Sequence, residues 1–175
     1  SLGTDLVLSP ADPPEIVVDN SLIVGPTKEV EASAPLPSRA RRTHFSFERA
    51  GLTLNDCYLY EPLTGESPLP TMLLVLPGPV LNWEMIPVPF AAEGFSVLAF
   101  YPLRGMDIDE DTADILTALE YLRQGRLPSR ADTDRLALVG ASFTSLHTYR
   151  LLALTDQVDV ALMLGGIANG FAFRH

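Results

Sequence analysis

The stretch Leu136-Ala-Leu-Val-Gly-Ala-Ser-Phe-Thr-Ser145 runs from an apolar segment through small residues into an amphipathic segment. The apolar part predicts a buried strand, and the part that follows repeats apolar residues at helical spacing. Gly140 and Ala141 leave room for a tight strand-to-helix turn, which would expose the hydroxyl of Ser142 above the edge of a sheet. The N–H groups of the following helix would then face developing negative charge. Ser142 is therefore a candidate nucleophile, although serine is also common as a plain helix N-cap.

Short apolar runs recur before and after this turn. We predict strands at residues 72–76, 96–101, 135–139 and 160–164. We predict helices at residues 111–123 and 142–154, and a third at 83–93 that prolines interrupt. Almost wholly apolar strands are typical of a parallel sheet that is covered on both faces. The alternation of strands and helices predicts an α/β fold, with a mostly parallel sheet flanked by helices.

The N-terminal part of the chain follows a different pattern. Residues 43–61 alternate apolar and polar side chains around a turn near Ala50-Gly51, which predicts an antiparallel hairpin. Residues 1–42 place prolines between short apolar runs, so we expect an extended arm draped on the core. The sequence thus divides into a proline-rich arm at 1–42 and an α/β domain at 43–175.

Charge and composition argue against several classes of function. The net charge of −10 disfavours a nucleic-acid binder, because such binding needs clustered Lys and Arg. Cys57 is the only cysteine, so neither an intrachain disulfide nor a cysteine metal site can form. No apolar run is long enough to span a membrane. We expect a soluble protein, and the compartment stays open between the cytoplasm and export after removal of a signal peptide.

Acidic residues cluster before and within the helix predicted at 111–123. They are Asp107, Asp109, Glu110, Asp111 and Asp114. The cluster lacks the glycine and the terminal glutamate of a calcium loop, so we predict no metal site. We interpret it as a solvated helix start, where the helix dipole favours negative charge.

The turn also resembles a known nucleophile motif. Residues Gly140-Ala141-Ser142-Phe143-Thr144 match Gly-x-Ser-x-Gly of the α/β-hydrolase superfamily, and the order of elements over residues 43–170 is similar to its dienelactone hydrolase and prolyl oligopeptidase branches. Residues 76–79, Leu-Pro-Gly-Pro, stand where that family has its oxyanion loop, and residues 100–105 resemble the segment after its fourth strand. The resemblance implies that Ser142 attacks an ester or amide carbonyl while the N–H of Phe143 donates to the oxyanion, with no cofactor.

Two departures from this pattern concern the groups around the nucleophile. Thr144 replaces the last glycine of the motif, which crowds the helix against the strand. Pro79 has no N–H to offer an oxyanion, so a second donor must come from Gly78, Val80, or the side chains of Asn82 or Trp83. Asn82 and Trp83 are also candidate pocket residues, although a tryptophan here is equally well explained by core or lid packing.

The acid and the base of the family are not evident in the sequence. The family order places an Asp or Glu, and then a His, after the strand predicted at 160–164. His44 is on the hairpin, His147 is five residues after the serine on the same helix, and His175 comes one strand too early. We therefore expect either the front part of an incomplete α/β-hydrolase fold or a catalytically inactive domain.

The sequence leaves three functions to compare. The leading hypothesis is a serine hydrolase that acts on a small ester or a peptide. The alternative is a catalytically inactive hydrolase-fold module used for binding or assembly, with a protein partner contacting the N-terminal arm. A flavodoxin-like nucleotide or flavin binder is disfavoured, because no glycine-rich phosphate-binding fingerprint is present.

Overall fold

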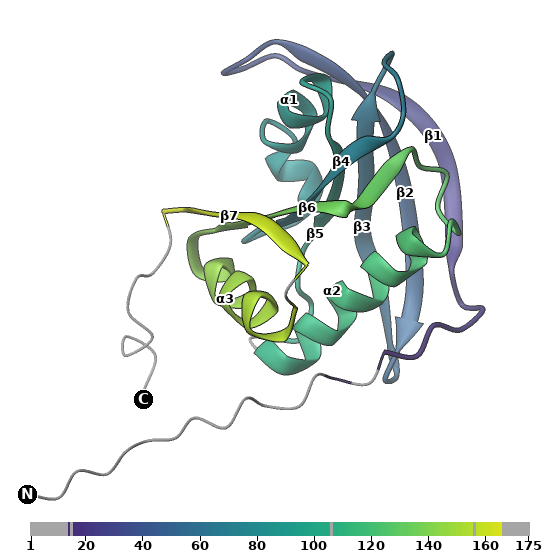
Figure 1. Ribbon diagram of the computed structural model, residues 1–175, viewed down its shortest axis with the longest axis vertical. Coiled ribbons are helices and arrows are strands. Elements are labelled where there is room, and N and C mark those ends of the chain that lie inside the picture. Colours follow the sequence, from purple (N-terminus) through teal and green to yellow (C-terminus); the bar gives the residue numbers. More distant parts are fainter. Residues whose placement is uncertain (1–13, 15, 106, 156, 166–175) are drawn as a thin grey trace, which may run out of the picture.

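The computed structural model describes residues 14, 16–105, 107–155 and 157–165. In this part of the chain, one seven-stranded sheet has the order β1-β2-β3-β5-β4-β6-β7 (Figure 1). The strands are β1 (Ile23–Ala32), β2 (Ser38–Arg49), β3 (Leu52–Pro62), β4 (Leu69–Val75), β5 (Ser96–Phe100), β6 (Ala131–Ala141) and β7 (Val158–Leu164). The helices are α1 (Pro87–Ala92), α2 (Ile108–Arg123) and α3 (Ser145–Leu154), with the short 3-10 turns η1 (Val80–Trp83) and η2 (Ser142–Thr144).

The half of the sheet formed by β5, β4, β6 and β7 is parallel, as the apolar runs predicted. Val75 of β4 lies opposite Phe100 of β5 on one side and Gly140 of β6 on the other. The carboxyl ends of these three strands therefore meet at one edge of the sheet, which we call the carboxyl edge. The turn that contains Ser142 and the loop that follows β4 both begin there.

The other half of the sheet is antiparallel and comes from the N-terminal part of the chain. Strands β2 and β3 form the predicted hairpin, and the turn between them places Ala50 and Gly51 at φ values of 46° and 75°. Strand β3 then pairs antiparallel with β5, which joins the hairpin to the parallel strands.

Part of the segment that we predicted to be an arm belongs to this sheet. Residues 23–32 form β1, which pairs with β2, and β2 itself begins at Ser38, so the division expected at residue 42 falls inside a strand. Pro26 is accommodated because β1 is an edge strand and its register shifts between Val24 and Thr27. Most of the arm expected before residue 23 lies outside the described residues.

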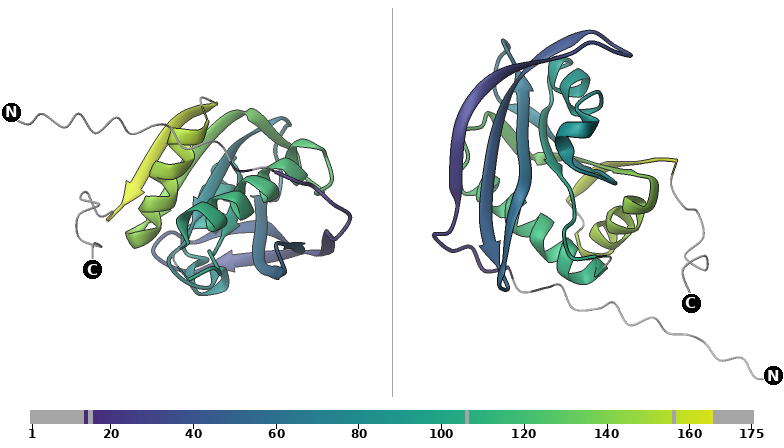
Figure 2. Two further views of the ribbon diagram at one scale, coloured as in Figure 1. Left: turned by 90° about the horizontal axis from the view of Figure 1, so that it is seen from below. Right: turned by 180° about the vertical axis from the view of Figure 1, so that it is seen from behind.

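Helices cover both faces of the sheet, and each face has its own core. Helix α1 packs over one face, mainly against β2, β3 and β5, and its Val88 and Ala91 are buried there. Helices α2 and α3 lie on the opposite face, as the two views of Figure 2 show. Ile115 and Leu119 of α2 are buried there beneath the hairpin and the parallel strands. No helix in the described part of the chain is both long and apolar enough to cross a membrane.

Candidate active site

The turn between β6 and α3 has the geometry of a nucleophile elbow. Ser142 adopts a φ of 57°, in the left-handed region that non-glycine residues rarely occupy, and it is exposed to solvent. The backbone leaves β6 at Ala141 in an extended conformation and enters the helical turn directly after Ser142. Such strain at a turn persists only where the surrounding structure holds it, and it is common at functional sites.

Gly140 allows the helix to approach the strand this closely. A Cβ added at this position would lie 2.3 Å from the Thr148 hydroxyl oxygen and 2.9 Å from the Cα of Ser145. Both of these atoms belong to α3, so any larger residue at 140 would push the helix away from β6. The close contact fixes the height of the Ser142 hydroxyl above the edge of the sheet.

Thr144, which replaces the last glycine of the motif, is fully buried. Its hydroxyl oxygen lies 2.6 Å from the carbonyl oxygen of Ala141 and 2.7 Å from that of Val75, and it accepts the N–H of Ala141 at 3.1 Å. The replacement therefore adds hydrogen bonds where we expected crowding. It also connects the elbow to the last residue of β4, next to the candidate oxyanion loop.

The loop after β4 presents fewer free N–H groups than the sequence suggested. Leu76 donates its N–H to Phe100 at 2.9 Å, which continues the sheet. The N–H of Val80 faces the carboxylate of Asp56, at 3.1 and 3.3 Å from its two oxygens. Val80 is therefore not available as the oxyanion donor that we considered, because Asp56, which the sequence analysis did not single out, accepts its N–H. Burial raises the pKa of this half-buried carboxyl above its usual value.

The two candidate pocket residues differ in their surroundings. Asn82 is exposed, and its backbone N–H donates to Pro79 at 2.9 Å in the turn η1. Trp83 is half-buried, and its indole nitrogen lies 2.9 Å from the place that a Cβ on Gly78 would occupy. Gly78 therefore lets the indole lie directly against the backbone of the loop. Of the two side chains, it is Trp83 that packs on this loop.

Neither histidine in the described residues pairs with Ser142. His147 is fully buried, and its Nε2 lies 3.1 Å from a carboxylate oxygen of Asp111. The Nε2 of His44 lies 2.7 Å from the backbone oxygen of Asn55 on the hairpin. His147 thus points away from the nucleophile, as expected for a residue five positions later. His175 lies outside the described residues.

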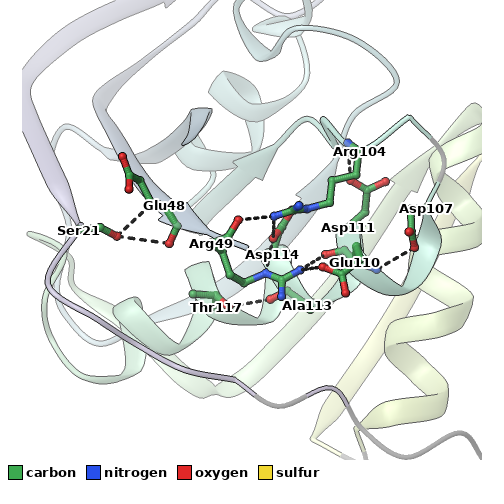
Figure 3. Close-up of polar contacts among 10 residues, drawn as sticks. All are labelled: Ser21, Glu48, Arg49, Arg104, Asp107, Glu110, Asp111, Ala113, Asp114 and Thr117. Atoms are coloured by element: carbon green, nitrogen blue, oxygen red, sulfur yellow. Dashed lines mark hydrogen bonds and ion pairs between the residues drawn. The ribbon is translucent and has the colours of Figure 1, made fainter. Parts of the chain in front are cut away.

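We expected Asp111 and Asp114 to belong to a solvated helix start, but this prediction is wrong for both. Their side chains are fully buried. Asp114 accepts hydrogen bonds from Arg49 at the end of β2 and from Arg104 in the loop after β5, the latter at 2.6 and 3.0 Å (Figure 3). Two arginines from other elements compensate the charge of this buried carboxylate. The pattern of acidic residues could not reveal this, because Arg49 lies 65 positions from Asp114 in the sequence.

Asp111 continues the network toward the nucleophile helix. One of its oxygens accepts the backbone N–H of Arg104 at 3.0 Å, and the other lies against His147 of α3 (Figure 3 for the Arg104 contact). The solvated interpretation still fits Asp107, which is exposed and caps α2 by accepting the N–H of Glu110 at 3.2 Å. The network therefore joins the hairpin, the loop after β5, α2 and α3.

A hollow of about 220 Å³ opens between the loop after β5 and the elbow. Phe143, the residue next to the candidate nucleophile, lines it, together with Tyr101 and Leu103 from the loop. His147 and Asp111 form another part of its wall. The hollow therefore lies beside the nucleophile turn, on the face of the sheet that α2 and α3 cover. Among the described residues, no group of three or more His, Cys, Asp or Glu could hold a metal ion.

Comparison with known proteins identifies the fold but no curated relative. No family model matches the sequence, and no curated protein matches it. Among solved structures, the acylaminoacyl peptidase of Pyrococcus horikoshii is similar, with a TM-score of 0.59 and 22% identity over 74% of this chain. The methylesterase BT1017 gives a TM-score of 0.65 with 16% identity over 82% of the chain.

A structure named as a dienelactone hydrolase from Klebsiella pneumoniae gives a TM-score of 0.54 with 17% identity over 86% of the chain. The present chain spans 24% of the peptidase, 35% of the methylesterase and 62% of the dienelactone hydrolase structure. At these identities the similarity shows the fold alone. The chain thus has the α/β-hydrolase fold that its sequence predicted.

Proposed function

We propose that this protein is the nucleophile-bearing part of a serine hydrolase that cleaves an ester or a peptide bond. The observation that carries the proposal is the elbow itself, where exposed Ser142 holds a left-handed backbone conformation between a buried strand and a helix. A plain N-cap serine needs no such strain, because a cap residue normally has an extended backbone. The peptidase and esterase neighbours support the same class of reaction.

The arrangement supports a defined first step. The Ser142 hydroxyl oxygen attacks the substrate carbonyl carbon, the new C–O bond forms, and the carbonyl electrons move onto oxygen. In this proposal the N–H of Phe143, at the start of the helical segment, donates to this oxyanion. The serine proton passes to a general base outside the described residues. When the oxyanion reforms the carbonyl, the bond to the alcohol or amine breaks, and the leaving group takes this proton from the base. Water releases the acyl group in the second half of the reaction.

A fluorophosphonate probe tests the proposal directly, because an activated serine displaces its fluoride and gains a fixed mass. We expect one adduct by intact mass, mapped to Ser142 by peptide digestion. Ser142→Ala should abolish the adduct. Ser38→Ala, which removes a serine at the start of β2, should leave it unchanged. A folded protein without any adduct at Ser142 would contradict the proposal.

A second candidate function is a catalytically inactive hydrolase-fold module used for binding or assembly. The observation that favours it is the hydrogen bonding of the two described histidines. His44 pairs with the backbone of Asn55 and His147 pairs with Asp111, so neither is paired with Ser142. This module would form a stable complex with a protein partner, through the N-terminal segment, without turning over esters. Hydrolysis of p-nitrophenyl esters that depends on Ser142 would argue against it.

A further inference from the structure

The donors available to an oxyanion on the β4 side of the elbow are few. Pro79 has no N–H, and the N–H of Val80 is directed at Asp56. Leu76 is hydrogen-bonded within the sheet. The donors that remain include the backbone N–H of Gly78, the side-chain amide of Asn82 and the indole N–H of Trp83, none of which donates to another described residue. Asn82 is exposed to solvent, whereas the indole of Trp83 packs on the loop.

The indole is held against the loop at Gly78, directly before Pro79. Its nitrogen lies 2.9 Å from the position of a Cβ on Gly78, so only glycine permits this contact. Trp83 closes the turn η1, in which the N–H of Asn82 donates to Pro79 at 2.9 Å and the N–H of Ile86 donates to Trp83 at 2.9 Å. The turn thus fixes the backbone on both sides of the indole.

The same loop is connected to the nucleophile. Thr144, two residues after Ser142, is hydrogen-bonded to the carbonyl of Val75, three residues before Gly78. This hydrogen bond holds the elbow and the loop in a fixed position relative to each other. A donor fixed on this loop is preorganised, and preorganised donors stabilise a developing oxyanion without a reorganisation cost.

We propose that the indole N–H of Trp83 is the second oxyanion donor of this site, in the place of the backbone N–H that Pro79 lacks. The inference rests on the proposed function, because an oxyanion forms only if Ser142 is a nucleophile. Trp83 is then a catalytic residue that contacts the carbonyl oxygen of the substrate. The Phe143 N–H supplies the first hydrogen bond and the indole supplies the second.

Trp83 is the only tryptophan of the chain, which makes the test direct. A ¹⁵N-labelled protein gives a single indole N–H signal in a proton–nitrogen correlation spectrum. Diisopropyl fluorophosphate should place a phosphoryl oxygen where the oxyanion forms when it reacts with Ser142. We expect the indole proton signal to move downfield in this adduct, as a hydrogen bond to the phosphoryl oxygen requires.

Labelling rates give an independent test. Trp83→Phe keeps an aromatic ring but removes the N–H, and we expect it to slow labelling by about 10²–10³-fold. Gly78→Ala retains its own N–H but places a methyl group against the indole nitrogen, so it should also slow labelling. Tyr149→Phe, which changes an exposed aromatic residue of α3, should label at the unmodified rate. Urea unfolding of each variant checks that the fold is retained.

The outcomes separate this inference from the function on which it rests. If no adduct forms on Ser142, the proposed function fails. If the adduct forms but the indole signal does not move, and Trp83→Phe labels at the normal rate, the assignment of Trp83 is wrong while the hydrolase proposal stands. If Gly78→Ala labels normally although Trp83→Phe is slow, the indole does not need its position on Gly78, and the geometric argument fails.

Discussion

The hydroxyl oxygen of Thr144 lies 2.7 Å from the carbonyl oxygen of Val75, so a side chain just after the candidate nucleophile Ser142 is hydrogen-bonded to the last residue of β4. In a glycine-ended motif this contact has no counterpart, because glycine has no side chain. The contact joins two parallel strands at the carboxyl edge, one that ends in the elbow and one that continues into the candidate oxyanion loop.

Thr144→Val tests the importance of this hydroxyl. The variant keeps the shape of the side chain but leaves the buried N–H of Ala141 without its acceptor, and it also removes the donor to Val75. We expect the free energy of unfolding to fall by about 1–3 kcal/mol, the cost of leaving buried polar groups unpaired. Thr144→Ser keeps the hydroxyl, so its free energy of unfolding should fall by clearly less. Urea denaturation measures both, and equal losses would show that the hydrogen bonds contribute little.

The strained backbone at Ser142 predicts a difference in stability between two variants that lack its hydroxyl. Ser142→Ala retains a Cβ at a φ of 57°, whereas Ser142→Gly relieves the steric strain. We expect the glycine variant to be more stable than the alanine variant by about 1 kcal/mol. At most positions outside such turns the order is reversed, because glycine is more flexible when unfolded. Thermal and urea unfolding of the two proteins would reveal the order, and a more stable alanine variant would contradict the elbow geometry.

The pairing of Asp111 with His147 predicts a large loss when the carboxylate is removed. Asp111→Ala leaves the buried N–H of Arg104 and the ring of His147 without their common partner. We expect a loss of about 3–5 kcal/mol, which is typical when one member of a buried polar pair is deleted. Asp109→Ala is the matched control on the same helix, since its carboxylate is 72% exposed and, within the described part of the chain, pairs only with Arg150. Asp109→Ala should lower the free energy of unfolding by less than about 1 kcal/mol.

The half-buried carboxyl of Asp56 predicts a pH-dependent effect. Burial raises its pKa in the folded state above the unfolded value, so folding favours the protonated form. Its contribution to stability is therefore fully present below the unfolded pKa and is lost as the pH rises through the folded pKa. Asp56→Asn, which cannot ionise, should be more stable than the natural protein at pH 7, with the difference shrinking toward pH 3.

The size of this effect is limited, because the Asp56 side chain is partly open to solvent and its charge is screened there. We expect Asp56→Asn to raise the free energy of unfolding by less than about 1 kcal/mol at pH 7. Urea unfolding at several pH values between 3 and 7 would measure it. A difference that grows as the pH falls would mean that the hydrogen bond from Val80 outweighs the cost of burying the charge.

Local patterns in the sequence were sufficient for most of the elements. The strand–turn–helix at residues 136–154 and the hairpin around Ala50-Gly51 were predictable, because side-chain periodicity and turn residues act over a few positions. The α/β fold followed from the alternation of these elements. Strand β1 was missed because prolines interrupt its pattern, and its stability comes from pairing with β2 rather than from its own residues.

The sequence by itself determined the parallel core, the elbow and the candidate nucleophile Ser142, since each depends on neighbouring residues. Only the tertiary structure decided which groups around the elbow are free to act. Asp56 accepts the N–H of Val80 across 24 positions, and Thr144 reaches Val75 across 69. The indole of Trp83 is fixed by its contact with Gly78. Such contacts depend on how strands are ordered in the sheet, and strand order is set by packing of the whole chain rather than by any local pattern.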